Sequence, residues 1–216
     1  MRRTYGRDRV EFGRVLAFSD GLFAIAMTLL IVAIGVPDIP DGDDVGDLAD
    51  ALDDLKPELI SFFISFAVIG RYWLAHHQFF SLLEKADQGL IGLNLVYLAF
   101  VAFLPFPTAL LGDYFENPLS IAIYATNVAT ISGMEVALYR HAYRRELFRR
   151  PLTPEVYRYG ALMSLSPVLI FLASIPVAFA STTTAALMWL LNIPMGVVGQ
   201  RRKPPGADEQ LFGLGD

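Results

Sequence analysis

Long apolar stretches alternate with short polar joints along the whole chain. An α-helix rises about 1.5 Å per residue, so about 20 apolar residues are needed to cross the hydrocarbon core of a membrane. We expect spans at 14–36, from Pro57 to between His77 and Phe80, and at 89–111, 119–139, 159–180 and 183–198. Prolines inside a span are tolerated, because neighbouring helices can satisfy the freed carbonyl groups. The pattern therefore predicts an all-α polytopic membrane protein with six transmembrane helices.

Composition supports this prediction and excludes several kinds of site. The chain has 216 residues, of which 54% are hydrophobic and 18% are charged, and its mean hydropathy is +0.46. Soluble domains carry roughly 25% charged residues, so the apolar surface here exceeds what one small core can bury. The chain has no cysteine, which excludes disulfides, thiolate metal sites and a cysteine nucleophile.

Positive charge gathers on one side of this layout. If the N-terminus is cytoplasmic and six spans alternate, every Lys and Arg except Lys56 falls on the cytoplasmic side. A Lys/Arg excess in short cytoplasmic loops sets the orientation of membrane proteins. The connection at 38–58 is acidic and falls outside. We expect a cell-membrane protein with one six-helix channel domain at 1–200, cytoplasmic N- and C-termini, and a short cytoplasmic tail at 201–216.

Asp20 stands inside the first span, about 9 Å beyond Arg14 along the helix. A carboxylate at that depth is costly unless it is paired, hydrogen-bonded or in contact with water, so it marks a candidate functional site. Matching depths along the first three spans predicts one polar cluster near the inner membrane face, made of Arg14, Ser19, Asp20, Trp73, His77 and Asn94. Clamping the three helices together is the favoured role of this cluster, and direct contact with a transported ion is the alternative.

The first span also carries an apolar stripe. At 100° per residue one face collects Phe18, Ile25, Leu29, Val32 and Val36, with Thr28 at its margin. Such a stripe can face lipid, which is the better interpretation on periodicity alone. If the helix lines a central axis instead, the stripe forms a narrow apolar constriction of the kind that gates channels by dewetting.

Other chemistries have little support in the sequence. His76 and His77 are adjacent on one predicted helix and point about 100° apart, so with Asp20 they make a poor zinc site. Serines in the spans have no positioned base nearby, so we expect no enzyme activity. The basic joint at 140–158 suits anionic lipid headgroups at the inner leaflet better than nucleic acid.

A resemblance to a known family sharpens the picture. The run Arg14-Val-Leu-Ala-Phe18-Ser19-Asp20 has the form RxxxFSD and is followed by GLFAIAMTLLI. This stretch resembles the opening of the first helix in the transmembrane protein 175 family of potassium channels. The second span, SFFISFAVIGRYWLAHHQFF, is similar to the matching family segment, including the W-x-x-x-H spacing of Trp73 and His77.

The resemblance implies an architecture and a set of residue roles. Prokaryotic members are six-span homotetramers that conduct potassium and lack the usual selectivity-filter loop; this chain has no TVGYG-like segment. The first helix would line the pore, with Ile25 as the main constriction, Leu29 and Val32 further out, and Thr28 near the pore. The residues that would hold this helix in place are Arg14, Phe18, Ser19, Asp20, Trp73, His77 and Asn94.

We therefore expect a homotetrameric, potassium-preferring cation channel whose first helix forms an apolar constriction. Its partners would be monovalent cations, membrane lipid and other copies of the chain. We expect no cofactor or metal centre beyond the permeant potassium ions, and no nucleic acid. The alternative is a secondary transporter or proton-coupled exchanger that uses Asp20 and His77 as a relay, although no convincing repeat relates the two halves of the chain.

Overall fold

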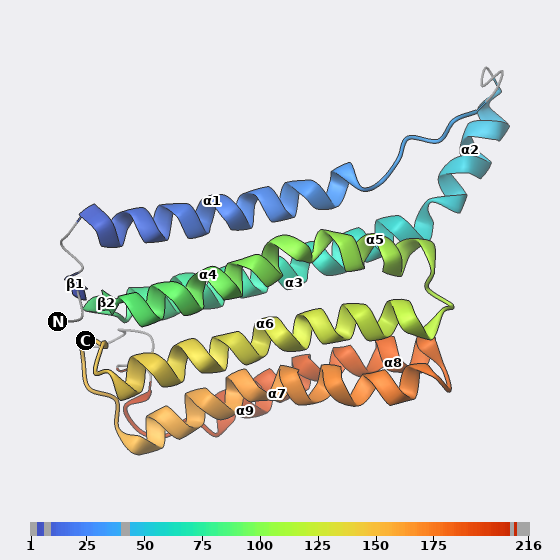
Figure 1. Ribbon diagram of the computed structural model, residues 1–216. Coiled ribbons are helices and arrows are strands. Elements are labelled where there is room, and N and C mark those ends of the chain that lie inside the picture. The colour runs from blue at the N-terminus through green and yellow to red at the C-terminus, as the bar shows by residue number, and fades with distance from the viewer. Residues whose placement is uncertain (1–3, 7–9, 40–43, 208–209, 211–216) are drawn as a thin grey trace.

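The computed structural model describes residues 4–6, 10–39, 44–207 and 210. Its long helices run side by side in one bundle (Figure 1). Six helical segments are long and apolar enough to cross a membrane, which confirms the six predicted spans and the all-α fold. They are α1 (Val10–Val32), α3 (Lys56–Ser81), α4 (Gln88–Phe103) with α5 (Pro105–Asp113), α6 (Pro118–Arg144), α7 (Pro154–Ala178), and α8 (Thr182–Met188) with η1 (Trp189–Leu191) and α9 (Asn192–Arg201).

Several helix ends differ from the predicted positions. Helix α1 begins at Val10 and ends at Val32, four residues before the predicted start and four before the predicted end, and α6 continues to Arg144, five residues past the predicted 139. Helix α7 begins at Pro154, five residues before the predicted start at 159. Thr153 caps it by accepting a hydrogen bond from the backbone N–H of Val156, and proline is well tolerated in the first helical turn.

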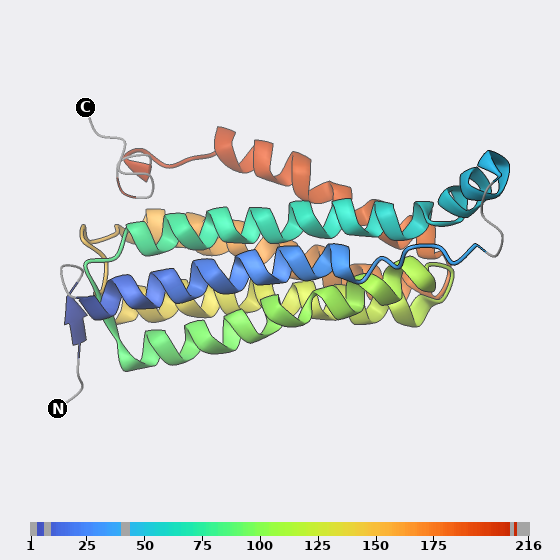
Figure 2. The same cartoon turned by 90° about the horizontal axis from the view of Figure 1, so that it is seen from above.

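The third and sixth spans are interrupted helices. In the third span α4 gives way to α5 around Leu104, where Pro105 and Pro107 cannot donate backbone hydrogen bonds. In the sixth span the 3-10 turn η1 separates α8 from α9. Figure 2 shows the resulting α8–α9 segment at the opposite edge of the bundle from α4.

Two short elements lie outside the predicted spans. The acidic connection contains an exposed helix, α2 (Val45–Asp54), which projects beyond the bundle (Figure 1) and ends beside an ion pair between Lys56 and Asp53. At the other end β1 (Thr4–Gly6) pairs antiparallel with β2 (Lys85–Asp87). The sequence analysis predicted none of these: the two strands are too short to show a period, and α2 was taken as part of the acidic connection although Val45, Leu48 and Leu52 have helical spacing.

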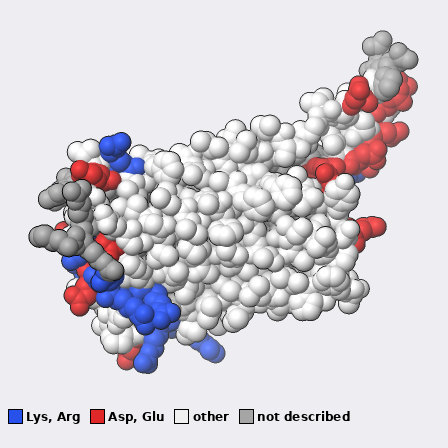
Figure 3. Space-filling view, viewed as in Figure 1, with Lys and Arg blue, Asp and Glu red and all other residues white. Residues whose placement is uncertain are grey.

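The packing order places α1 at one side of the bundle. Helix α1 contacts α3 and α4, whereas α6 packs against α4 and α7, and α7 packs against the α8–α9 segment. The largest fully buried side chains, Tyr97 and Tyr124, belong to α4 and α6. Figure 3 shows a broad surface without charged residues between the two ends. Lys and Arg gather at the end that holds both termini, and the acidic residues of α2 lie at the opposite end (Figures 1 and 3).

Part of the predicted tail packs onto the bundle. Ala207 is buried together with Tyr139, Leu152 and Val156 at the α6–α7 connection. The side-chain oxygen of Gln210 accepts a hydrogen bond from the backbone N–H of Thr153 at 3.0 Å. The chain after 200 is therefore partly docked against the six-helix domain.

Candidate functional site: a polar network beneath the first helix

A chain of hydrogen bonds joins α1, α4 and α3 inside the bundle. His76 Nε2 lies 2.8 Å from Asn94 Oδ1, and Asn94 Nδ2 donates to Ser19 Oγ at 3.0 Å. Ser19 in turn donates to the backbone oxygen of Val15 at 2.9 Å. Because an amide oxygen can only accept, His76 must donate from Nε2. Every bond in the chain thus runs in one direction, which fixes the three helices in register.

Burial makes this network costly to disturb. Ser19, His76 and Asn94 are all nearly inaccessible to solvent. The His76 ring is enclosed by aromatic rings, with ring centroids 4.4 Å from Phe80, 5.4 Å from Phe23 and 5.6 Å from Tyr97. Leaving a buried polar group without a partner costs more folding free energy than the hydrogen bond itself contributes. The network therefore favours one position of α1 relative to α3 and α4.

A second bond links Asp20 to α3. The indole Nε1 of Trp73 donates to Asp20 Oδ1 at 2.9 Å. Trp73 and Asp20 are only partly buried, so this bond lies at the edge of the α1–α3 contact. The His77 ring lies tilted against Trp73 with ring centroids 5.8 Å apart, but within the described chain it makes no hydrogen bond to Asp20.

The other two predicted network residues lie away from these bonds. Arg14 is exposed near the start of α1 and lines a small cavity beside β2, with no ion pair to Asp20 in the described part of the chain. Phe18 is 54% exposed and belongs to the outward face of α1. The structure thus brings Ser19, Asp20, Trp73 and Asn94 into hydrogen-bonded contact and leaves Arg14, Phe18 and His77 outside it.

The apolar stripe of α1 faces outward from the protomer. Ile25 is 59% exposed, and Leu29 and Val32 are also exposed. Thr28, at the margin of the stripe, is exposed and returns its hydroxyl to the backbone oxygen of Ala24 at 2.8 Å. The opposite face, with Phe23, Ala26 and Leu30, is buried against the bundle. The stripe is therefore available to lipid or to neighbouring subunits.

Two residues near the network escaped the sequence interpretation. His76 was set aside in favour of His77, although His76 shares the buried face of α3 with Ser65, Ile69 and Tyr72 at helical spacing. That spacing is the signal that identifies it. Glu135 of α6 is a second acid inside a span, with a buried carboxylate oxygen near Arg71 and Tyr97.

Arg71 lies within the predicted second span and within α3, about 15 Å before the helix ends at Ser81, the end that the charge count assigned to the cytoplasmic side. A long side chain can keep its charged group toward the interface or toward another charge while its methylenes stay in the bundle. Glu135 of α6 is the acidic residue near Arg71, although the two make no ion pair within the described residues. Among the residues that the structure describes, no group of three or more His, Cys, Asp or Glu could hold a metal ion.

These features define a class: a six-span α-helical membrane protein whose first helix is held by buried polar bonds and shows an apolar face outward. Residues 14–105 match the family described as "Endosomal/lysosomal potassium channel TMEM175". The chain belongs to this family, whose named members are ion channels and not enzymes.

Individual relatives agree with this assignment. A potassium channel from Streptomyces collinus is 41% identical over 138 residues, which cover 62% of this chain and 66% of the relative, just under two thirds. The human endosomal/lysosomal proton channel TMEM175 is 34% identical over 181 residues, covering 78% of this chain and 35% of the human protein. The crystal structure of a lysosomal potassium-selective channel TMEM175 homolog from Chamaesiphon minutus superposes with a TM-score of 0.70 at 31% identity, covering 88% of this chain and 99% of that one.

Proposed function

We propose that this protein is a potassium-preferring cation channel in which four copies of the chain surround a central pore lined by α1. The observation that carries the proposal is the division of α1 into two faces. One face is locked to α3 and α4 by buried hydrogen bonds, and the other presents Ile25, Leu29 and Val32 outside the protomer. The potassium-selective relative from Chamaesiphon minutus, with the same fold, supports the choice of ion.

Four copies of the outward stripe would make rings of apolar side chains along the axis. Ile25 would form the main constriction, with Leu29 and Val32 one and two turns further along and Thr28 beside them. An apolar ring of this kind controls conduction by admitting or expelling water. The chain would then select and gate ions without a carbonyl-lined filter loop.

In this proposal the network acts by positioning. Ser19 and Asn94 fix the rotation of α1 about its own axis, and Asp20 and Trp73 hold the same turn of the helix. Rotating α1 by one residue would move each side chain by about 100° and take Ile25 off the axis. Arg14, Phe18 and His77, at the rim of this network, remain predicted contributors to the same positioning.

We also propose that the protein lies in the cell membrane with both termini in the cytoplasm. The support is the gathering of Lys and Arg at the end of the bundle that holds both termini (Figures 1 and 3). Positive residues in short loops favour the cytoplasmic side.

Flux through liposomes tests the function. The purified protein, reconstituted with a potassium gradient and a potential-sensitive dye, should pass potassium in preference to sodium with no second substrate present. Ile25→Asn places a polar group in the proposed constriction and should change potassium flux or the potassium-to-sodium ratio severalfold. Light scattering of the detergent-purified protein, with the detergent mass subtracted, should give four times the 23.9 kDa mass of the chain.

The matched control is Leu169→Asn. Leu169 is 60% exposed, close to the 59% of Ile25, but lies on α7, which is on the other side of the bundle from α1 (Figure 1). It should leave flux and selectivity unchanged. Flux that requires a counter-ion would favour the exchanger that uses Asp20 and His77, and equal effects of the two substitutions would contradict a pore lined by α1.

A further inference from the structure

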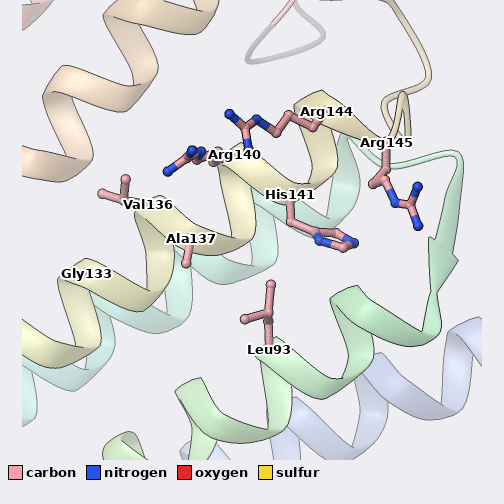
Figure 4. A pocket seen from close by; sticks show the side chains of 8 residues that line it. All are labelled: Leu93, Gly133, Val136, Ala137, Arg140, His141, Arg144 and Arg145. Carbon is pink, nitrogen blue, oxygen red and sulfur yellow. The ribbon is translucent and has the colours of Figure 1, made fainter.

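A cleft lies between α4 and α6 at the end of the bundle where Lys and Arg gather (Figure 4). It measures about 700 Å³, and the network of α1 takes no part in it. Its lining combines apolar side chains with a cluster of bases: Leu93, Gly133, Val136, Ala137, Arg140, His141, Arg144 and Arg145. An apolar cavity topped by several cations is complementary to a ligand that has both an apolar part and an anionic part.

Two of the three arginines are available to such a ligand. His141 Nε2 lies 2.8 Å from Asp87 Oδ1, and Arg145 Nε lies 3.4 Å from Asp87 Oδ2, so these two bases already face a carboxylate. Arg140 and Arg144 make no ion pair with any described residue and are exposed. They are spaced i, i+4 and therefore share one face of α6 (Figure 4).

The apolar part of the cleft continues from these arginines toward the membrane interior. Gly133, Ala137, Arg140 and Arg144 follow one another at helical spacing along the same face, over about 16 Å of helix axis. Gly133 keeps the inner part open, because a Cβ atom built there would have no neighbouring atom within 4 Å. Leu93 of α4 points toward this face from the opposite wall (Figure 4).

We propose that this cleft binds one anionic phospholipid. The phosphate oxygens would accept hydrogen bonds from the guanidinium groups of Arg140 and Arg144, and one acyl chain would lie along the groove past Ala137 and Gly133. Arginine is suited to this task because its planar fork matches phosphate geometry. Basic pockets between transmembrane helices are a recurring mode of recognising lipid headgroups.

Charge complementarity favours a lipid over a second copy of the chain. The acidic residues of α2, which form the largest gathering of negative charge in Figure 3, lie at the opposite end of the bundle from the cleft. A second copy in the same membrane orientation would hold them at that same far end. An anionic lipid, in contrast, places its negative phosphate at the level of the arginines and its acyl chains beside the apolar wall.

Native mass spectrometry of the detergent-purified full chain tests the proposal. Dioleoyl phosphatidylglycerol and dioleoyl phosphatidylcholine share acyl chains and differ in net charge. The first should bind saturably with one lipid per chain, and at least tenfold more tightly than the second. The double variant Arg140→Gln/Arg144→Gln should weaken phosphatidylglycerol binding about thirtyfold, at about fivefold for each charge near the surface.

Matched controls separate the cleft from general charge and from misfolding. Arg201→Gln/Arg202→Gln removes the same charge from the end of α9 and should leave binding unchanged. Gly133→Leu should fill the groove and weaken binding severalfold with every arginine intact. Gly92→Leu should have no effect, because Gly92 also has open space around it but does not line the cleft.

Three outcomes would overturn the proposal: equal binding of the two lipids, unchanged binding in the Arg140→Gln/Arg144→Gln variant, or full competition by inorganic phosphate, which would indicate a site for free anions. Because binding is measured without ion flux, the result does not depend on the proposed channel activity. A chain that binds phosphatidylglycerol but passes no potassium would contradict only the function proposed above.

Discussion

The two sides of the bundle hold their helices together by different means. On the α1 side, hydrogen bonds between side chains cross helix boundaries: Asn94 bonds Ser19 and His76, and Trp73 bonds Asp20. These groups lie within the membrane-spanning segments, where polar contacts have few alternatives in lipid. Each of these hydrogen bonds also requires its donor and acceptor to be aligned.

On the α7 side, aromatic rings pack across several helix boundaries. Tyr157 of α7 stacks between Tyr139 and Tyr143 of α6, with centroids 5.5 Å and 3.9 Å away. Trp189 of η1 packs between Tyr124 and Phe171, and its indole donates to Ser174 Oγ at 3.0 Å. Aromatic packing contributes mainly through contact area, and ring pairs are favourable over centroid separations of about 4.5–7 Å, a wider range than a hydrogen bond allows.

The difference indicates which helix must keep a defined rotation. Directional bonds fix which side of α1 faces outward, and α1 is the helix that carries the proposed pore stripe. Aromatic contacts hold α7 close without fixing its rotation as strictly, as suits a helix whose outward face meets lipid. The following substitutions remove bonds on each side, in order of decreasing expected effect.

Among the substitutions that remove hydrogen bonds, Asn94→Leu should have the largest effect on stability. It keeps the approximate volume but removes both bonds of Asn94, which leaves the buried Nε2 of His76 without its acceptor. His76 Nδ1 already lacks a hydrogen-bond partner among the described residues, so the ring would lose its last one. We expect a loss of about 2 kcal/mol in the free energy of unfolding. Denaturation by SDS, followed by far-UV circular dichroism, measures it.

Leu98→Ala is the control. It changes a buried residue of the same helix and removes no hydrogen bond. Leu98 is fully buried on α4, and its truncation lowers stability by lost packing. Under the proposal, Asn94→Leu changes the potassium-to-sodium flux ratio as well as stability, whereas Leu98→Ala changes stability alone. Unaltered selectivity in Asn94→Leu would break the link between the network and the orientation of α1.

Trp73→Phe should have a smaller effect. It keeps an aromatic ring beside His77 and removes only the N–H that donates the hydrogen bond to Asp20. Hydrogen bonds to a charged acceptor are the stronger kind, but both groups are partly exposed, so we expect a loss of about 1 kcal/mol. The same SDS titration measures the loss. A loss as large as that of Asn94→Leu would place the main support of α1 at Asp20 and not at Ser19.

Much of the layout could be predicted from the sequence because membrane burial imposes strong constraints. Six apolar stretches of sufficient length leave little choice of fold, and the charge at their ends marks the two sides. The contacts Asp20–Trp73 and Ser19–Asn94 join residues that depth matching had placed at one level. Depth along a helix follows from counting residues, so this part of the site was accessible.

Rotation about the helix axis was harder to predict. His76 and His77 have nearly the same depth but point about 100° apart, and depth matching alone cannot choose between them. The buried face of α3, with Ile69 and Tyr72, decides in favour of His76. Glu135 was missed although it lies inside the predicted span at 119–139, where the rule applied to Asp20 would also have marked it. Only its neighbours Arg71 and Tyr97, which come from two other helices, needed the structure.

Trp189→Phe completes the comparison and should have the smallest effect. The chain has two tryptophans, and each donates its indole N–H across a helix boundary, so the same substitution removes the same group on both sides of the bundle. On the α7 side the acceptor left behind is the neutral hydroxyl of Ser174, which keeps its own bond to the backbone oxygen of Phe171 at 2.7 Å. Hydrogen bonds between membrane helices average about 0.6 kcal/mol, and we expect a loss near that value.

The contrast between the two tryptophan variants isolates the acceptor. Both variants lose the same ring volume. A larger loss of unfolding free energy in Trp73→Phe than in Trp189→Phe therefore measures what the carboxylate of Asp20 adds to the strength of the hydrogen bond. Flux should distinguish them further, since Trp189 packs far from α1 and its substitution should leave potassium selectivity unchanged. If Trp189→Phe destabilised the protein more, the α7 side would depend on directional bonds as strongly as the α1 side. The rotation of α1 would then need another explanation than the polar network beneath it.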